Sequence, residues 1–280
     1  MLNKSLTVIV PPIAETKCSN DCGYCFAKNS IAVPARETLD ERFEYLNRLN
    51  YAREEGYNNL IITGNGIEPL QNKEWLNRFF SAVAAMDKPF RKIEFRTFGT
   101  DLDLEYLHSM GVTTLVLMCY DIFNEENNAK LVGNVIPITE IVNATKTFGM
   151  DIRLEILLNE SYNHKTAEAV INRCKALGVN QVTFRGLYYN PLVANANDAW
   201  LQENGVLKSW YDLLVDYIQM NGVILHTLET GLTQYDMNGI SIVLKSLEDD
   251  ATINHKETFA VLREDIYLYT KWNTLASKIL

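Results

Sequence analysis

Short apolar runs alternate with amphipathic segments over the first two thirds of the chain. Continuous apolar runs of this length are typical of strands that are buried on both faces. They span residues 6–10, 59–63, 92–97, 114–120, 151–158 and 180–187. Helices are predicted between them, over residues 38–55, 72–86, 103–110, 139–148 and 165–177. Strands that alternate with helices predict an α/β fold, and six such units suit an open, partial (β/α)6 barrel like part of a TIM barrel.

The pattern changes after residue 190. Residues 191–198 are typical of a loop, and a helix is predicted over 207–220. Asn238-Gly239 lies between two strand-like runs and predicts a hairpin with a type I′ turn, and Glu264-Asp265 marks a weaker second hairpin. We therefore expect two parts: a core barrel over residues 1–190, and an extension over 191–280 of one helix and β-hairpins that covers the barrel.

The charge balance narrows the class of partner. The chain has 280 residues, with 26 Lys and Arg against 35 Asp and Glu, a formal net charge of −9. An acidic protein of this kind does not coat nucleic acid through a broad basic face. No apolar run approaches the roughly 18 residues that span a bilayer, and the short run at 6–10 lacks the features of a signal peptide. We expect a cytoplasmic protein with no membrane partner.

Three of the five cysteines lie within eight residues. Cys18, Cys22 and Cys25 form the pattern C-x3-C-x2-C, just after the first predicted strand. In a reducing compartment such a group favours metal or redox chemistry. Three thiolates can hold three irons of a [4Fe–4S] cluster and leave the fourth iron open, as a catalytic centre needs. Structural zinc is the alternative, but its fourth ligand would have to come from one of four sequence-remote histidines.

The spacing of these cysteines at the end of a first strand resembles the radical S-adenosylmethionine (SAM) enzymes. The resemblance covers about residues 6–190. It implies that SAM chelates the open iron, that one electron cleaves SAM to methionine and a 5′-deoxyadenosyl radical, and that this radical takes hydrogen from a substrate. It also implies an electron donor such as flavodoxin or ferredoxin.

The resemblance further assigns contacts to SAM. Tyr24, the aromatic residue before the third cysteine, corresponds to the residue that lies against adenine. The segment Gly64-Asn65-Gly66-Ile67-Glu68-Pro69 is similar to the family's G-G-E-P motif, which holds the SAM amino group. Glycines let backbone carbonyls approach an ammonium group, and a carboxylate helps to neutralise it. Ile67 departs from the motif, because it separates the glycine from the glutamate.

Four later strand ends complete the implied SAM site. Thr97, Cys119, Asn159 and Leu187 lie at or just after the ends of the third to sixth strands, where barrel enzymes place their chemistry. Cys119 stands where the family often has serine. Packing in the core is the alternative for Cys119, and it is the preferred interpretation for Cys174, which lies among apolar residues of a helix.

Three charged residues lie on the last two predicted strands of the barrel. Arg153 and Glu155 share one face of the strand over 151–158, and Arg185 lies on the next strand. Charges buried in a barrel need partners. Substrate or SAM is one candidate partner, and a structural ion pair among these residues is the other.

The substrate is expected to be a small molecule. No cysteine follows Cys174, so the cysteine-rich extension common in peptide-modifying radical SAM enzymes is absent. A peptide-modifying maturase and an enzyme that activates a glycyl-radical partner are alternatives within the family. A non-enzymatic iron–sulfur electron carrier or sensor is the alternative outside it.

Overall fold

The computed structural model describes residues 4–13, 16–29, 41–133, 137–228, 231–247, 249, 259–262, 268–269 and 278–279. The chain forms two compact units. The first contains residues 1–19, 26–115 and 254–280, and the second contains residues 20–25 and 116–253. In the part that the structure describes, no helix combines the length and apolarity needed to cross a membrane.

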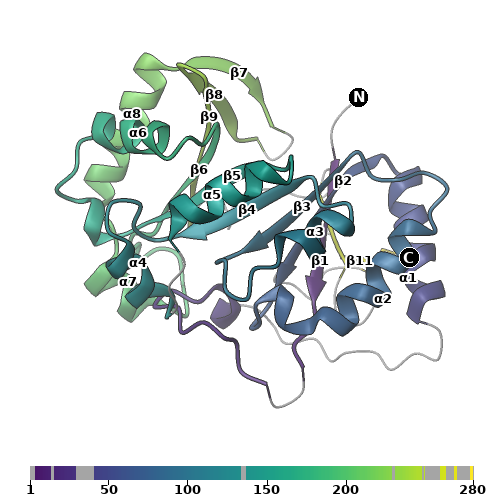
Figure 1. Ribbon diagram of the computed structural model, residues 1–280. Helices are drawn as coiled ribbons and strands as arrows, with labels where there is room; N and C mark the ends of the chain where they lie inside the picture. The colour runs from purple at the N-terminus through teal and green to yellow at the C-terminus, as the bar shows by residue number, and fades with distance from the viewer. Residues whose placement is uncertain are drawn as a thin grey trace. The chain divides into compact units, whose positions relative to one another are not determined.

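The first unit is built on a parallel group of strands (Figure 1). Its strand order is β12-β11-β10-β1-β2-β3, in which β10, β1, β2 and β3 run parallel and β11 and β12 are antiparallel to their neighbours. The bounds are β1 Lys4–Val10, β2 Tyr57–Gly64, β3 Lys92–Thr97, β10 Phe259–Leu262, β11 Leu268–Tyr269 and β12 Lys278–Ile279. The apolar runs of β1 and β2 are almost wholly buried, as predicted.

Aromatic side chains join two helices of the first unit, α1 (Glu41–Glu54) and α2 (Lys73–Ala84), which lie side by side in Figure 1. The Trp75 ring stacks on Phe79 and meets Tyr45 edge-on, and the Trp75 indole N–H donates to the Tyr45 hydroxyl at 3.0 Å. The remaining helices of the unit are η1 (Phe26–Asn29), η2 (Pro69–Asn72) and α3 (Leu104–Ser109).

The second unit also has parallel strands with a hairpin at one edge. β4 begins in the first unit and ends in the second. After β4, the strand order of the second unit is β5-β6-β9-β8-β7. β5, β6 and β9 run parallel, and β8 and β7 are antiparallel to their neighbours. The bounds are β4 Thr114–Cys119, β5 Asp151–Leu158, β6 Gln181–Gly186, β7 Val223–Thr227, β8 Thr233–Met237 and β9 Ile240–Ser246.

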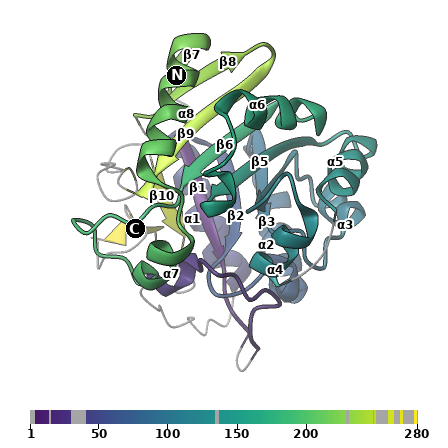
Figure 2. The same cartoon turned by 90° about the vertical axis from the view of Figure 1, so that its left-hand side faces the viewer.

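One glycine lets a helix approach the sheet of the second unit. A Cβ at Gly186, the last residue of β6, would lie 2.8 Å from the ring of Tyr211 on α8. Figure 2 shows α8 beside the β8–β9 hairpin. The helices of this unit are α4 (Glu125–Val132), α5 (Ile138–Thr147), η3 (Glu160–Tyr162), α6 (Ala167–Ala176), α7 (Asp198–Asn204) and α8 (Lys208–Asn221).

The predicted alternation of strands and helices is confirmed, with helix and strand ends shifted by a few residues. The turn Asn238-Gly239 joins β8 to β9 with positive φ at both positions, as a type I′ turn requires. The turn at Glu264-Asp265 and the predicted helix start at Thr38 lie outside the described residues, although β10 and β11 pair as predicted. Two helices, α4 and α7, were not predicted.

The strands of the C-terminal extension pair with strands of the barrel. β9 lies parallel to β6, and β10 lies parallel to β1. The extension therefore adds strands next to β1 in the first unit and next to β6 in the second unit. The division into 1–190 and 191–280, with the second part covering the first, stays a prediction.

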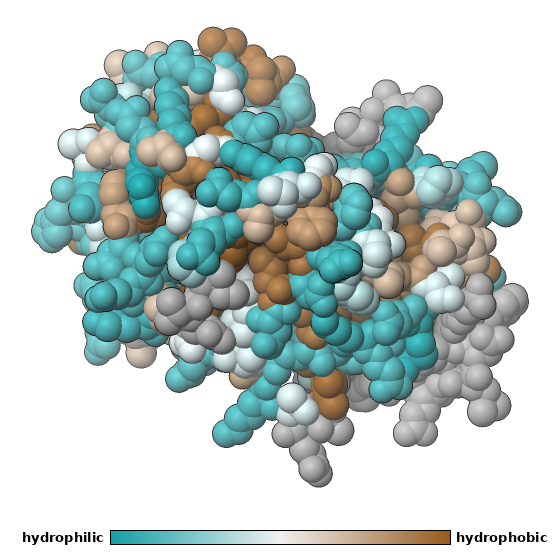
Figure 3. Space-filling model, viewed as in Figure 1, coloured by the Kyte–Doolittle hydropathy of each residue, from teal (hydrophilic) through white to brown (hydrophobic). Residues whose placement is uncertain are grey.

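Apolar side chains are exposed at the edge of the second unit. They lie along β7, at Val223, Ile224 and Leu225, and on α8 at Leu213 and Met220. Brown apolar surface is visible over this region at the top of Figure 3. Among the described strands, β7 pairs only with β8, so it is a terminal strand of the sheet.

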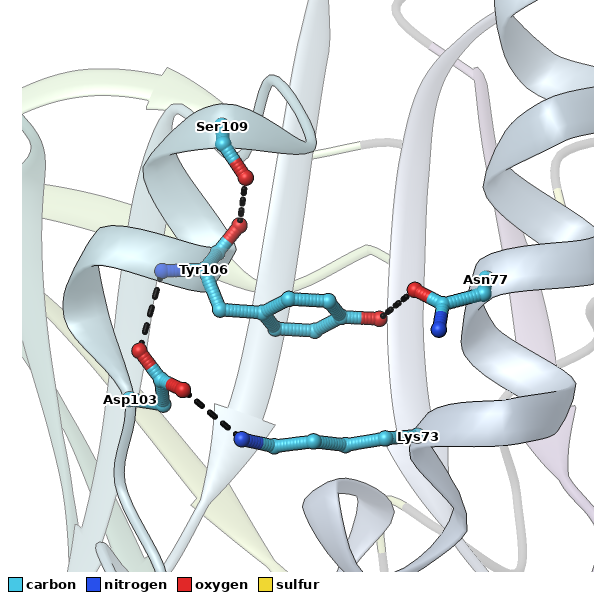
Figure 4. A network of polar contacts seen from close by, with 5 residues as sticks. All are labelled: Lys73, Asn77, Asp103, Tyr106 and Ser109. Carbon is cyan, nitrogen blue, oxygen red and sulfur yellow. Dashed lines mark hydrogen bonds and ion pairs between the residues drawn. The ribbon is translucent and has the colours of Figure 1, made fainter.

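A polar network links α2 to α3 in the first unit (Figure 4). The Asp103 carboxylate accepts from the Tyr106 amide at 3.0 Å, which caps α3, and from Lys73 Nζ at 2.7 Å. The Tyr106 hydroxyl donates to Asn77 at 2.9 Å. Burial, with the charge of Asp103 as a smaller cause, raises the pKa of Tyr106 to about 12.

We predict that Asp103→Ala lowers the free energy of unfolding by about 1 kcal/mol, mainly through the lost helix cap, because the ion pair is exposed and contributes less. Urea unfolding at pH 7 measures the effect. Tyr106→Phe, which keeps the cap and loses one exposed hydrogen bond, is the matched control with the smaller loss. Equal unfolding midpoints for wild type and Asp103→Ala would contradict the assignment.

The difference in stability between wild type and Asp103→Ala should depend on pH in a defined way. The hydrogen bond from Lys73 lowers the pKa of Asp103, followed by the bond from the Tyr106 amide. The contribution of Asp103 is therefore fully present above the pKa of an unfolded Asp, about 3.9, and is lost as the pH falls through the lower folded value. The difference between wild type and Asp103→Ala should shrink only in that acid range.

Candidate functional site: the cysteine loop and the strand ends

The three clustered cysteines follow β1, whose last residue is Val10. Cys18, Cys22 and Cys25 are reduced, and each is half-buried. Within the described residues, no group of three or more His, Cys, Asp or Glu side chains is placed closely enough to hold a metal ion. Their donor chemistry nevertheless suits an iron–sulfur cluster, since three half-buried thiols on one short loop supply the sulfur ligands that such clusters take.

The backbone around Cys18 is held by Gln71 within the first unit. Gln71 Oε1 accepts from the Ser19 amide at 2.9 Å, and Gln71 Nε2 donates to the Lys17 carbonyl at 3.1 Å. Gln71 Oε1 also accepts from the Glu68 amide at 3.1 Å. One side chain thus brackets Cys18 and ties its loop to the segment that contains Glu68.

The backbone around Cys22 is held by the end of α4 within the second unit. The Asp21 and Gly23 amides donate to the carbonyls of Val132 and Leu131 at 2.9 and 3.0 Å. Gly133 ends the helix in the left-handed region, with φ 83°, and a Cβ there would lie 2.8 Å from the Asp21 nitrogen. The cysteine loop therefore satisfies helix carbonyls that would otherwise lack a partner.

The backbone of Cys25 is held by Asn197, also within the second unit. Asn197 Oδ1 accepts from the Cys25 amide at 3.3 Å, and Asn197 Nδ2 donates to the Cys25 carbonyl at 3.0 Å. The side chain of Asn197 brackets a single residue, as a paired strand would.

Glu68 and Thr97, both predicted to contact SAM, bind each other within the first unit. The Thr97 hydroxyl donates to Glu68 Oε2, and the Phe98 amide donates to Glu68 Oε1 at 3.1 Å. Glu68 is only 3% exposed. Its carboxylate is thereby fixed in orientation between the ends of β2 and β3.

The loop before Glu68 explains how the extra residue Ile67 fits. The side chain of Ile67 is buried, and its carbonyl folds over Gly64, where a Cβ would overlap it. Gly66 has φ 75°, in the region that favours glycine, and is exposed, while Asn65 is half-buried. Gly64 is therefore required for a close approach of backbone to backbone.

Tyr24 is almost fully buried, at 1% exposed. Its ring meets Trp200 edge-on at 5.9 Å, its hydroxyl accepts from Asn195 Nδ2 at 3.0 Å, and its carbonyl accepts from the Tyr120 hydroxyl at 2.7 Å. These contacts fix the cysteine loop from inside the second unit. A contact of Tyr24 with adenine stays a prediction.

Asn159 and Leu187 connect strand ends of the second unit. Asn159 Nδ2 donates to the carbonyls of Tyr120 and Leu157 at 2.8 and 2.9 Å, and its Oδ1 accepts from the Ser161 amide at 3.1 Å. The Leu187 amide donates to the Leu158 carbonyl at 3.1 Å. Both residues are buried, so the structure gives them a connecting role, and their contacts with SAM stay predictions.

Cys119 is fully buried at the end of β4. Burial is the main cause that raises the pKa of its thiol well above the usual value, and the neighbouring Cys174 thiol is the second cause. Burial likewise raises the pKa of Cys174 to about 12. These environments favour the alternative of core packing for Cys119, and a cofactor contact there stays a prediction.

The buried charges on β5 and β6 form a structural ion pair. Glu155 Oε1 accepts from Arg185 Nε at 3.0 Å and from Nη2 at 2.9 Å, with side-chain exposures of 4% and 8%. The ion pair is confirmed for Glu155 and Arg185, and a contact of the three charges with substrate or SAM stays a prediction.

Sequence reasoning missed the side chains that hold the loop, namely Gln71, Asn195, Asn197 and Trp200. A helix start could have been predicted from the Asn197-Asp198 pair, which is typical of a helix N-terminus. The contact with Cys25, 172 residues away, leaves no such local pattern.

Comparison with solved structures identifies the fold. The chain is similar to Streptococcus suis SuiB bound to S-adenosylmethionine, with a TM-score of 0.61 and 14% identity over 99% of this chain and 63% of that one. It is also similar to anSMEcpe with bound AdoMet and the Cp18Cys peptide (TM-score 0.59, 14% identity, 95% and 73% covered). A third similar structure is that of Escherichia coli coproporphyrinogen III oxidase (HemN), a radical SAM enzyme, with a TM-score of 0.51 and 16% identity over 88% of this chain and 63% of that one.

The chain therefore has the α/β fold of the radical SAM enzymes, an open partial barrel, and the resemblance inferred from its cysteines is confirmed at the level of the fold. It spans about three fifths of the length of the SuiB chains that it matches. No model of a known protein family matches the chain, and no curated protein matches it in sequence.

We predict that iodoacetamide labels Cys18, Cys22 and Cys25 in the folded, metal-free protein at least about tenfold faster than Cys119 and Cys174, because the thiolate is the reactive form and burial disfavours it. Peptide mass spectrometry after timed quenching measures the five rates, and labelling in urea is the control that makes all five accessible. Early labelling of Cys119 in the folded protein would contradict its placement.

Proposed function

We propose that the protein is a radical SAM enzyme. The observation that carries the proposal is the C-x3-C-x2-C loop, which directly follows β1 of the radical SAM fold. Cys18, Cys22 and Cys25 would hold a [4Fe–4S] cluster through three of its irons. That cluster, when bound with SAM at its open iron, supplies the electron that splits SAM into methionine and a 5′-deoxyadenosyl radical, which takes a hydrogen atom from the substrate.

Residues of the chain would orient SAM. Glu68 supplies a buried carboxylate for the SAM ammonium group, and its bonds from Thr97 and Phe98 keep that carboxylate in place before SAM arrives. The glycines of the loop at 64–66 let backbone carbonyls come close to the same group. Gln71, which brackets Cys18 and accepts from the Glu68 amide, couples the cluster ligand to the SAM loop.

For the substrate, we propose a peptide as the class to test first. SuiB is known bound to its precursor peptide SuiA, and anSMEcpe bound to the Cp18Cys peptide. These two neighbours outweigh the expectation of a small molecule, which rests on the lack of cysteines in residues 175–280. We also propose flavodoxin or ferredoxin as the electron donor, and a cytoplasmic location.

The decisive experiment is anaerobic reconstitution with iron and sulfide, followed by SAM and dithionite. We expect about four irons per chain, a [4Fe–4S] EPR signal after reduction, and 5′-deoxyadenosine measured by chromatography. Cys22→Ala should abolish the product, while Cys174→Ala, which changes a buried thiol outside the loop, should retain it. A wild-type chain that takes up zinc and forms no cluster would overturn the proposal.

The role of Glu68 is tested separately by SAM affinity. Glu68→Gln keeps the shape and removes the charge, so the Kd of the reconstituted protein for SAM should rise about tenfold, the loss of a hydrogen bond between charged groups. Isothermal titration calorimetry measures the Kd. Glu74→Gln, at an exposed carboxylate on α2, is the matched control. Equal affinities in the two variants would show that Glu68 does not bind SAM.

A further inference from the structure

A segment far along the chain surrounds the last residues of the cysteine loop. Asn195, Asn197 and Trp200 all contact the stretch from Gly23 to Cys25 within the second unit. A Cβ at Gly23 would overlap the Trp200 indole, so the ring lies directly on the loop backbone. Trp200 also meets the rings of Tyr24 and Tyr120 edge-on, at 5.9 and 6.2 Å.

Asn197 occupies a position where its side chain would ordinarily serve its own helix. It is the N-cap of α7, yet its side chain makes no capping hydrogen bond. Its amide group is directed to Cys25 instead, accepting from the N–H and donating to the carbonyl. Asn197 is 3% exposed, and its own backbone N–H donates to Asn195 Oδ1 at 2.9 Å, which holds it in place.

In this unit, the backbone amides of every second residue from Asp21 to Cys25 donate to protein oxygens. The Asp21 and Gly23 amides bind the carbonyls of Val132 and Leu131, and the Cys25 amide binds Asn197 Oδ1. An amide that donates instead to a ligand sulfur stabilises the negative charge added on reduction, and so raises the reduction potential of an iron–sulfur cluster. Of these three acceptors, the one at Cys25 comes from a side chain, so a point substitution can remove it.

We propose that Asn197 is a positioning residue for Cys25. It orients Cys25 and keeps the Cys25 amide away from the cluster sulfurs, and it thereby keeps the reduction potential of the cluster low. The proposal rests on the proposed function, in which Cys25 ligates a [4Fe–4S] cluster. A low potential favours transfer of the electron to SAM.

Two variants at Asn197 separate this role from general support of the fold. Asn197→Ala removes the acceptor and frees the Cys25 amide, so the potential should rise by about 59 mV, the equivalent of a tenfold easier one-electron reduction. Asn197→Asp keeps an acceptor oxygen and adds a negative charge, so its potential should stay at or below that of wild type. Loss of a purely structural contact would move both variants in the same direction.

The potential is measured by EPR during a redox titration of reconstituted protein without SAM. Asn221→Ala, at the exposed end of α8 with only a local bond to the Tyr217 carbonyl, is the matched control and should leave the potential unchanged. A rise in Asn197→Ala without a rise in Asn197→Asp supports the proposal. An unchanged potential in Asn197→Ala, or a rise in both variants, overturns it.

A second readout uses the metal-free protein and does not depend on the cluster. Asn197→Ala should change the iodoacetamide labelling rate of Cys25 at least about threefold relative to Cys22, which is held by backbone groups of α4. If Asn197→Ala fails to take up a cluster, a changed Cys25 rate supports positioning and an unchanged rate overturns it. If wild type itself takes up no cluster, the proposed function fails, while the labelling still reports whether Asn197 holds Cys25.

Discussion

The proposed chemistry of this protein depends on fixing the backbone of one short loop. Eight residues with three thiols cannot form a core of their own, and a ligand set that moves would bind its metal group weakly. The fold supplies the missing order from three separate elements: the side chain of Gln71, the carbonyl end of α4 and the side chain of Asn197. Each element holds the backbone at or beside one cysteine through hydrogen bonds to main-chain groups.

The end of α4 illustrates how one feature can meet two needs. The last carbonyls of a helix need donors, and the amides of an irregular loop need acceptors. Asp21 and Gly23 meet Val132 and Leu131, and both needs are satisfied. The carbonyl end of a helix also carries a partial negative charge, which disfavours adding an electron nearby and acts in the same direction as the proposed role of Asn197.

Local patterns in the sequence predicted β1 to β6, β8 to β11, most helices, the β8–β9 hairpin and the cysteine motif, because each depends on periodicity or on residues close together in the chain. The strands β7 and β12 were not predicted. Of the two missed helices, α4 lacks that signal, while α7 begins at the Asn197-Asp198 pair. α4 is short and polar, and its buried residues are Asn128 and Val132. The bonds of Gln71 and Asn197 to the cysteine loop join residues 52 to 172 positions apart through side-chain amides, which no periodicity marks. Their discovery required the fold.

Glu68 shows what the structure adds to a residue that the sequence singles out. The sequence places a carboxylate after a glycine turn, and the family resemblance assigns it to SAM; the structure adds that Thr97 and Phe98 already hold it. A carboxylate has about four acceptor positions, and orienting it before binding reduces the entropy lost when a ligand is captured. The cysteine backbone and Glu68 are thus both held by hydrogen bonds to the protein itself, so neither has to be ordered by a ligand.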